Sequence, residues 1–409
     1  MNVFRVGAYK SAVEPFTRTD MSPQDREESL AYLGAMWNGY QEEVAKARKL
    51  APGAIAKYVD SLAAGMTAQK GDGAKLALEA GLVTGIRTSL EVERELVELV
   101  GENRDQDSYS QVGVEDYLRV VHAEAKLRGD GKPVVGVVVA AGEILDGDQP
   151  AGTVGGESTA QLIREARLDD DVKALVLRID SPGGSMFAAE QIHREIEAIK
   201  AEGKPVVVSM GDLAASGGYY IAAPADEIWA RPTTITGSIG IFATIPTVNR
   251  TLDKIGVGVD GVGTTTWSGQ LRLDRPIGKE AGQFLQATVE HGYEIFLARV
   301  ADGRGKTRDE IDAIAQGRVW AGSDAKRLGL VDHLGGTHDA LPAAAALAKL
   351  EEGGYEVEFI EPSLSWAQEL ALQVKTMVAQ VVAGLGIRMP ASLTRVVEQL
   401  DPIAAEVER

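Results

Sequence analysis

The chain repeats part of its own sequence at a spacing of about 250 residues. Three blocks match in order, VFRVG with VDGVG, GY with GY and GLV with GLV, and they begin at Val3 and Val259, Gly39 and Gly292, and Gly81 and Gly329. The offset falls slowly from 256 to 248 residues, as small deletions in loops would produce. Self-similarity of this kind indicates a duplicated folding unit, and it constrains the architecture before any local pattern does.

The offset places the counterpart of residues 131–255 before Met1. We therefore expect one and a half copies in a chain that looks N-terminally truncated. Residues 1–130 would be the second part of an incomplete first repeat, and 131–345 a complete second repeat. Residues 346–409 would form a C-terminal strand and an amphipathic helical tail. The polar face of that tail holds Glu369 as well as Lys375, and this weak basic character favours a packing or oligomer helix over one lying on a membrane surface. The apolar residues at helical spacings are Trp366, Leu370, Val374, Met377, Val381 and Leu385.

The charge and composition exclude several classes of function. The 60 acidic and 42 basic residues leave a net charge of −18. Nucleic-acid phosphates require clustered lysine and arginine, so we expect no nucleic-acid partner. With no cysteine, the chain cannot form disulfides, thiolate zinc sites or a cysteine nucleophile. It also lacks an apolar run of about 18 residues, so we expect any membrane anchor to lie outside this sequence.

Residues 131–345 have the pattern of alternating strands and helices. Strands that are buried on both faces give continuous apolar runs, and helices with one buried face give apolar residues three and four apart. These patterns predict strands at 134–139, 174–179, 206–210 and 228–230, and helices around 162–166 and 189–199. The alternation implies βαβ units and an α/β fold. Ligands of such sheets bind at the carboxyl ends of the strands.

Two loops expected at these strand ends are rich in glycine and other small residues. SPGG (181–184) follows the second strand, and GDLAASGGYY (211–220) follows the third. Gly183 and Gly184 allow backbone N–H groups to face outward, where they can stabilise negative charge on a carbonyl oxygen. Ser216 stands where a nucleophile elbow would place a serine. On its own, Ser216 could equally be a helix-capping residue in an ordinary turn.

A serine nucleophile needs a base, and the five histidines do not offer one in these loops. His193, for example, reads as a half-buried helix residue, so a Ser-His-Asp triad is disfavoured. The alternative is a neutral lysine. Because the ordinary lysine pKa is about 10.4, burial has to lower it to about 7. Lys10 fits best, since Val6, Ala8 and Val13 surround it in sequence, whereas most other lysines stand among charges.

Four motifs occur in order: YKSAVEPF (9–16), DSPGG (180–184), GDLAASGGYY (211–220) and TGSIGIF (236–242). Together they resemble the long, tandem-repeat form of the signal peptide peptidase A (protease IV) family, which belongs to the Clp protease and crotonase fold group. The resemblance implies a spiral of βαβ units and a serine peptidase that degrades signal peptides after their release. It also implies location at the bacterial cytoplasmic (inner) membrane, with the catalytic part on the outer (periplasmic) side.

The resemblance also implies roles for particular residues. Lys10, from the first repeat, would be the general base, and Ser216, from the second, the nucleophile. Ser238 in TGSIG would orient the lysine, and the oxyanion and substrate-binding amides would be those of Gly217, Gly184 and Gly183. Such a Ser/Lys mechanism needs no metal and no cofactor. The implied partners are a peptide substrate, a membrane anchor absent from this sequence and three further copies of the chain in a tetramer.

Two other functions fit parts of the sequence. A crotonase-like enzyme would use the glycine-rich amides to hold an acyl-thioester enolate, although it needs no serine at position 216. A catalytically silent scaffold would bind a membrane partner, as the truncation suggests.

Overall fold

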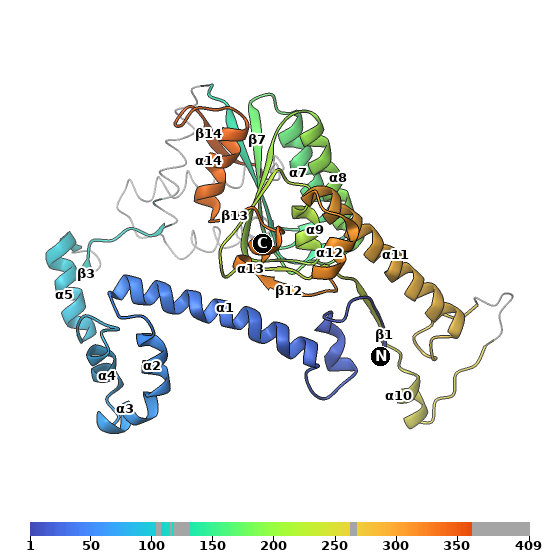
Figure 1. Ribbon diagram of the computed structural model, residues 1–409, viewed down its shortest axis with the longest axis horizontal. Coiled ribbons are helices and arrows are strands. Elements are labelled where there is room, and N and C mark those ends of the chain that lie inside the picture. The colour runs from blue at the N-terminus through green and yellow to red at the C-terminus, as the bar shows by residue number, and fades with distance from the viewer. Residues whose placement is uncertain (104–107, 115–116, 118–130, 262–267, 362–409) are drawn as a thin grey trace, which may run out of the picture. The chain divides into compact units, whose positions relative to one another are not determined.

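The computed structural model describes residues 1–103, 108–114, 117, 131–261 and 268–361 (Figure 1). His122, the end of the 259–263 block and the predicted helical tail beyond residue 361 lie outside these ranges. The chain divides into two compact units, Met1–Ala35 with Pro133–Arg409, and Met36–Lys132. The division into copies at residues 130 and 345 stays a prediction.

The larger unit is built on a mixed sheet of eight strands. The strand order is β12-β10-β8-β7-β4-β14, and in addition β9 pairs with β8 and β13 with β9. Only β12 is antiparallel to its neighbour. The predicted α/β class and all four predicted strands are confirmed. The strands are β4 (Val134–Ala141), β7 (Val172–Ser181), β8 (Val206–Ala215), β9 (Glu227–Ala230), β10 (Ile235–Gly237), β12 (Val319–Ala321), β13 (His333–Leu334) and β14 (Glu356–Phe359).

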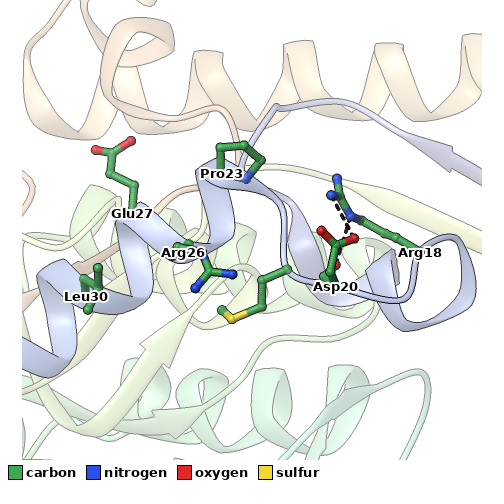
Figure 2. A pocket seen from close by; sticks show the side chains of 7 residues that line it. Arg18, Asp20, Pro23, Arg26, Glu27 and Leu30 are labelled. Carbon is green, nitrogen blue, oxygen red and sulfur yellow. Dashed lines mark hydrogen bonds and ion pairs between the residues drawn. The ribbon is translucent and has the colours of Figure 1, made fainter.

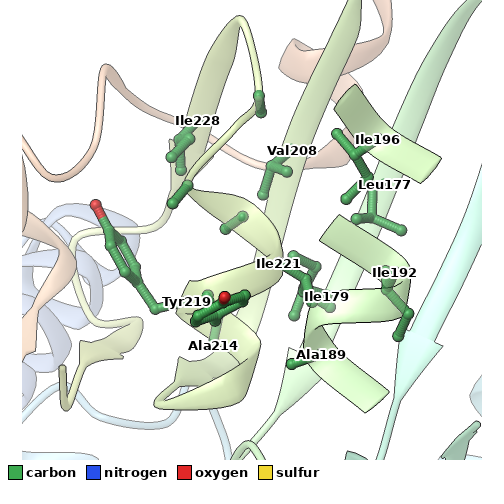
Figure 3. Close-up of a cluster of buried hydrophobic side chains, with 14 of the residues drawn as sticks. Leu177, Ile179, Ala189, Ile192, Ile196, Val208, Ala214, Tyr219, Ile221 and Ile228 are labelled. Atoms are coloured by element: carbon green, nitrogen blue, oxygen red, sulfur yellow. The ribbon is translucent and has the colours of Figure 1, made fainter. Parts of the chain in front are cut away.

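Helices pack on both faces of this sheet, which explains its continuous apolar strands. Leu177 and Ile179 of β7 face Ile192 of α8 (Figure 3), whereas Ala174 and Val176 pack against the helix on the other face. Each fully buried aliphatic side chain contributes roughly 1.5–3 kcal/mol. The helices on the first face are α7 (Gly156–Leu168), α8 (Met186–Ala201) and α9 (Gly217–Ala222), and the opposite helix is α14 (Thr337–Leu347).

Strand β8 changes its partner along its length. Residues Val207–Ser209 pair with β9, and Leu213–Ala215 pair with β10. The prediction of a loop over 211–220 is therefore wrong, because residues 211–215 belong to β8 and residues 217–220 to α9 (Gly217–Ala222). Small residues permit the strand to continue because β10 and β7 supply backbone partners as far as Ala215. The chain then turns directly into α9, so position 216 lies at the carboxyl end of a central strand.

A two-stranded ribbon joins the start of the chain to the second half. β1 (Asn2–Arg5) pairs antiparallel with β11 (Phe242–Ile245). The Tyr9 N–H then donates to the Gln316 carbonyl at 3.0 Å. At Gly7, φ is +102° and an added Cβ would lie 2.4 Å from the Gln316 backbone, so only glycine fits. This path delivers Lys10 to the edge of the sheet, just before the 3₁₀ helix η1 (Ser11–Phe16).

The helices outside the sheet layers recur with the offset seen in the sequence. Three pairs have equal lengths, and their offset falls from 256 through 254 to 249 residues: α1 (Pro23–Arg48) with α11 (Lys279–Arg304), α2 (Ala54–Asp60) with α12 (Arg308–Ile314), and α4 (Gly73–Glu79) with α13 (Gly322–Leu328). Both members of the last pair end just before a glycine with positive φ, at Gly81 and Gly329.

The remaining elements are short. The smaller unit also contains α3 (Leu62–Ala68), α5 (Ser89–Val100), β2 (Glu102–Asn103) and β3 (Ser108–Tyr109), and the larger contains β5 (Ile144–Leu145), β6 (Val154–Gly155) and α10 (Asn249–Lys254). Among the helices of the described residues, none combines the length and the apolar character needed to cross a bilayer.

Candidate active site

Ser216 lies at a strained turn between β8 and α9. Its φ of 54° and ψ of −118° fall in a region that a residue with a side chain rarely adopts. A hydrogen bond of 2.9 Å from the Ser216 N–H to the Gly237 carbonyl, at the end of β10, holds this conformation. The sharp turn presents the Ser216 hydroxyl at the carboxyl end of the sheet, which is the geometry of a nucleophile elbow.

The Lys10 amine lies beside that hydroxyl. Its Nζ is 3.2 Å from Ser216 Oγ, 2.9 Å from Ser238 Oγ and 3.1 Å from the Ser238 carbonyl oxygen. A neutral amine has two N–H groups and one lone pair. It can therefore donate to both oxygens of Ser238 and still accept the proton of the Ser216 hydroxyl. All three distances are within the reach required for general acid–base chemistry.

Burial changes the protonation of Lys10. The residue is 5% exposed, and desolvation lowers its pKa to about 8, while the charge of Glu28 opposes the shift. The Phe242 ring centroid lies 5.8 Å from Nζ and adds an apolar surface on one side. The backbone of Gly317 closes another side, since an added Cβ there would lie 2.9 Å from the Lys10 Cβ. A substantial neutral fraction near neutral pH follows from this setting.

Ser238 is held next to the amine by the backbone of two strands. It follows β10 with a φ of 52°, and its N–H donates to the Arg318 carbonyl at 2.7 Å. This bond aims both Ser238 oxygens at Lys10.

The SPGG loop packs directly on the turn at Ser216. An added Cβ on Gly183 would lie 2.6 Å from the Gly217 nitrogen, and one on Gly217 would lie 3.2 Å from the Gly184 nitrogen. The Gly183 N–H donates to Ser181 Oγ at 3.1 Å, so this N–H is used in a hydrogen bond within the SPGG loop. Gly184 and Gly217 thus lie close to each other beside Ser216. Ile144 anchors the loop, because its N–H donates to the Gly183 carbonyl and its carbonyl accepts from the residue after Gly184.

The structure therefore brings together all six residues singled out in the sequence. Among the residues that it describes, Ser216 Oγ has Lys10 as its hydrogen-bond partner. His193 lies elsewhere, with Nδ1 3.5 Å from the Tyr220 carbonyl. It is only 1% exposed, so the expectation of a half-buried residue is wrong, because α8 packs against α9 there as well as against the sheet.

Sequence reasoning missed several supporting residues. Ser181 lies inside the DSPGG motif, so the motif itself was a signal for it. Ile144, which also shapes the SPGG loop, lies outside all four motifs. Phe242 ends the TGSIGIF motif. Glu28 carries no such signal, because it stands in the highly charged stretch PQDREES.

A cavity of about 580 Å³ opens near the start of α1 (Figure 2). It has charged and apolar walls, and none of the six site residues lines it: Arg18, Asp20, Met21, Pro23, Arg26, Glu27 and Leu30. In the described residues there is no group of three or more histidine or acidic side chains placed to hold a metal ion.

Sequence comparisons find proteins that are similar to this chain. Residues 1–97 and 198–351 match the sequence profile described as peptidase family S49. Protease 4 of Salmonella typhi is 44% identical over 89% of this chain and 58% of that protein. A putative signal peptide peptidase SppA of Enterococcus faecium is 31% identical over 46% of this chain and 55% of that protein. The chain thus spans less than two thirds of either relative.

Among solved structures, a ClpP1 mutant from Listeria monocytogenes is similar over 54% of this chain and 99% of that chain. The sequence identity is 18% and the TM-score is 0.34.

Proposed function

Because the chain belongs to peptidase family S49, we propose that it is a serine endopeptidase with a Ser216–Lys10 dyad. Its substrates are cleaved signal peptides and other hydrophobic peptides. The observation that carries the proposal is the distance of 3.2 Å between Lys10 Nζ and Ser216 Oγ, with the lysine buried and its pKa lowered to about 8.

The reaction is an acyl transfer. Neutral Lys10 takes the Ser216 proton as the hydroxyl oxygen attacks the peptide carbonyl. The ammonium that forms gives its proton to the leaving amine, and the peptide bond breaks to leave an acyl-enzyme. Lys10 then deprotonates a water molecule, which attacks the acyl carbonyl. The ester bond to Ser216 breaks, the Lys10 ammonium returns its proton to Ser216 Oγ, and the acid product leaves. Ser238 keeps the amine in line through both steps, because its two oxygens accept the remaining N–H groups.

The Gly184 and Gly217 amides stabilise the oxyanion of each tetrahedral intermediate. Gly184 and Gly217 lie close together beside Ser216, and donors fixed in advance need no reorganisation as the charge develops.

The location and assembly of the enzyme follow from the family resemblance. The catalytic unit works on the outer face of the bacterial cytoplasmic membrane, is held there by a membrane anchor, and assembles as a homotetramer. The relative named signal peptide peptidase supports the substrate class. Sedimentation of the purified chain tests the tetramer, and a monomer at micromolar concentration would contradict it.

Substitution of the dyad tests the function. Ser216→Ala and Lys10→Ala should each lower the hydrolysis of casein and of a synthetic signal peptide by 10²-fold or more, because nucleophile and base act as one unit. Ser61→Ala is the matched control, since the Ser61 hydroxyl bonds within its own helical turn. Full activity of Ser216→Ala would refute the proposal, and turnover of acyl thioesters in place of peptides would favour a crotonase-like reaction.

A further inference from the structure

A buried carboxylate lies near Lys10 that the proposed mechanism does not use. Glu28, on the second turn of α1, is 3% exposed and is the one buried residue of that helix. Its neighbour Glu27 is on the outside, where it lines the cavity of Figure 2. A buried carboxylate is costly unless it is hydrogen-bonded, so its contacts identify what it supports.

Glu28 joins the two segments that carry the site. Its Oε1 accepts the hydroxyl of Ser11, the residue after Lys10, at 3.4 Å. Its Oε2 accepts the N–H of Val319 at 3.1 Å. Val319 follows Arg318, whose carbonyl holds the Ser238 N–H. One carboxylate therefore ties the backbone beside the base to the backbone beside the serine that orients it.

The charges around Glu28 are few. Asp25, on the same helix, disfavours its ionisation, whereas the Arg318 guanidinium, the Ser11 hydroxyl and the Val319 amide favour it. Burial outweighs them and raises the pKa of Glu28 to about 7. The ionised carboxylate in turn raises the pKa of Lys10 against the effect of burial. The other buried carboxylate of this region, Glu14, is engaged by the Ser22 N–H and faces Arg5.

We propose that Glu28 is a positioning residue of the active site, which fixes Lys10 relative to Ser238 and whose negative charge sets the pH range in which Lys10 acts as a base. This inference rests on the proposed function. An ionised Glu28 holds the proton on Lys10, so the enzyme reaches full rate only at higher pH than burial of the lysine alone would require.

Glu28→Gln separates the charge from the hydrogen bonds. The amide keeps an acceptor for the Val319 N–H but has no charge, so the rising limb of the kcat/KM profile, where Lys10 loses its proton, should move to lower pH by on the order of one unit. Glu27→Gln removes a charge from the adjacent, exposed position and should leave the profile in place. Ser11→Ala weakens ionisation of Glu28 and should move the limb in the same direction by less. Ser11→Ala can replace Glu28→Gln in this test if the Glu28→Gln protein does not fold.

A second readout keeps the two proposals apart. In the Ser216→Ala protein, the ¹³Cε resonance of Lys10, assigned by its loss in Lys10→Arg, reports protonation without peptidase activity. Glu28→Gln should lower the pH of its transition. The role of Glu28 would be overturned if the Lys10 titration curve of Glu28→Gln, or that of Ser11→Ala, were the same as the curve of the parent protein. This outcome would hold whatever the peptidase activity. A shifted titration in an enzyme that keeps its activity without Lys10 would instead overturn the dyad.

Discussion

Two serines with positive φ flank the Lys10 amine. Ser216 and Ser238 have φ values of 54° and 52°, and both hydroxyls lie within hydrogen-bond reach of Nζ. Such backbone strain costs of order 1–3 kcal/mol at each residue. The surrounding strands offset that cost, because Gly237 and Arg318 accept the two N–H groups. The strain thus coincides with the positions whose side chains must point at the base.

The buried lysine should cost the protein stability. Its pKa is about 8 in the folded chain and about 10.4 when unfolded, so the unfolded state binds its proton more tightly. Stability is therefore reduced below pH 8 by about 3 kcal/mol, and this loss disappears as the pH rises toward 10.4.

Lys10→Met should accordingly stabilise the inactive enzyme. At pH 7 the variant should gain at least about 1 kcal/mol after the lost hydrogen bonds are counted, and the gain should shrink at pH 10. Denaturant unfolding at the two pH values measures it. A Lys10→Met protein that is less stable than the parent at pH 7 would show that burial of the Lys10 amine does not reduce the stability of the folded protein.

At the scale of elements, the SPGG loop and the β8–α9 turn form one structure. The backbone of Ile144 in β5 is hydrogen-bonded to the SPGG loop. An added Cβ at Gly184 would lie 2.0 Å from the Ile144 carbonyl oxygen. The loop cannot move back to accept a side chain, so any substitution displaces the Gly184 amide from the space beside Ser216.

Gly184→Ala should therefore lower kcat by roughly 10²–10³-fold, the usual cost of one oxyanion donor. Gly34→Ala, in a helix where nothing lies within 4 Å of the new Cβ, is the control and should keep full activity. Steady-state kinetics with one peptide compares the two. If Gly184→Ala stays within threefold of the parent enzyme, this amide does not hold the oxyanion.

The strands and the dyad could be predicted from sequence because each leaves a local pattern. Continuous apolar runs marked the strands, and Lys10 stood out for its apolar neighbours. The extension of β8 to Ala215 could not be predicted, since it depends on pairing with β10. Glu28 was missed for a related reason. Its burial results from contact with Val319, 291 residues away, which no local pattern reports.

At the scale of the molecule, the active site depends on chain segments that are far apart in sequence. The ribbon of β1 and β11 joins residues about 240 apart and brings Lys10 to the strand ends of the second half. Helices of equal length recur at the offset of the matching sequence blocks, as a duplication would leave them. The proposed base, Lys10, and the proposed nucleophile, Ser216, therefore come from segments 206 residues apart in the chain.

The most direct test of the proposed Ser216–Lys10 dyad is the rate at which a fluorophosphonate labels Ser216. The rate is measured from pH 6 to 10 in the parent enzyme and in Lys10→Ala. In the parent enzyme the rate should rise through about pH 8 as Lys10 loses its proton, and in Lys10→Ala it should be about 10²-fold lower with no such rise. A flat parent profile, or a Lys10→Ala enzyme labelled as fast as the parent, would contradict a lysine base.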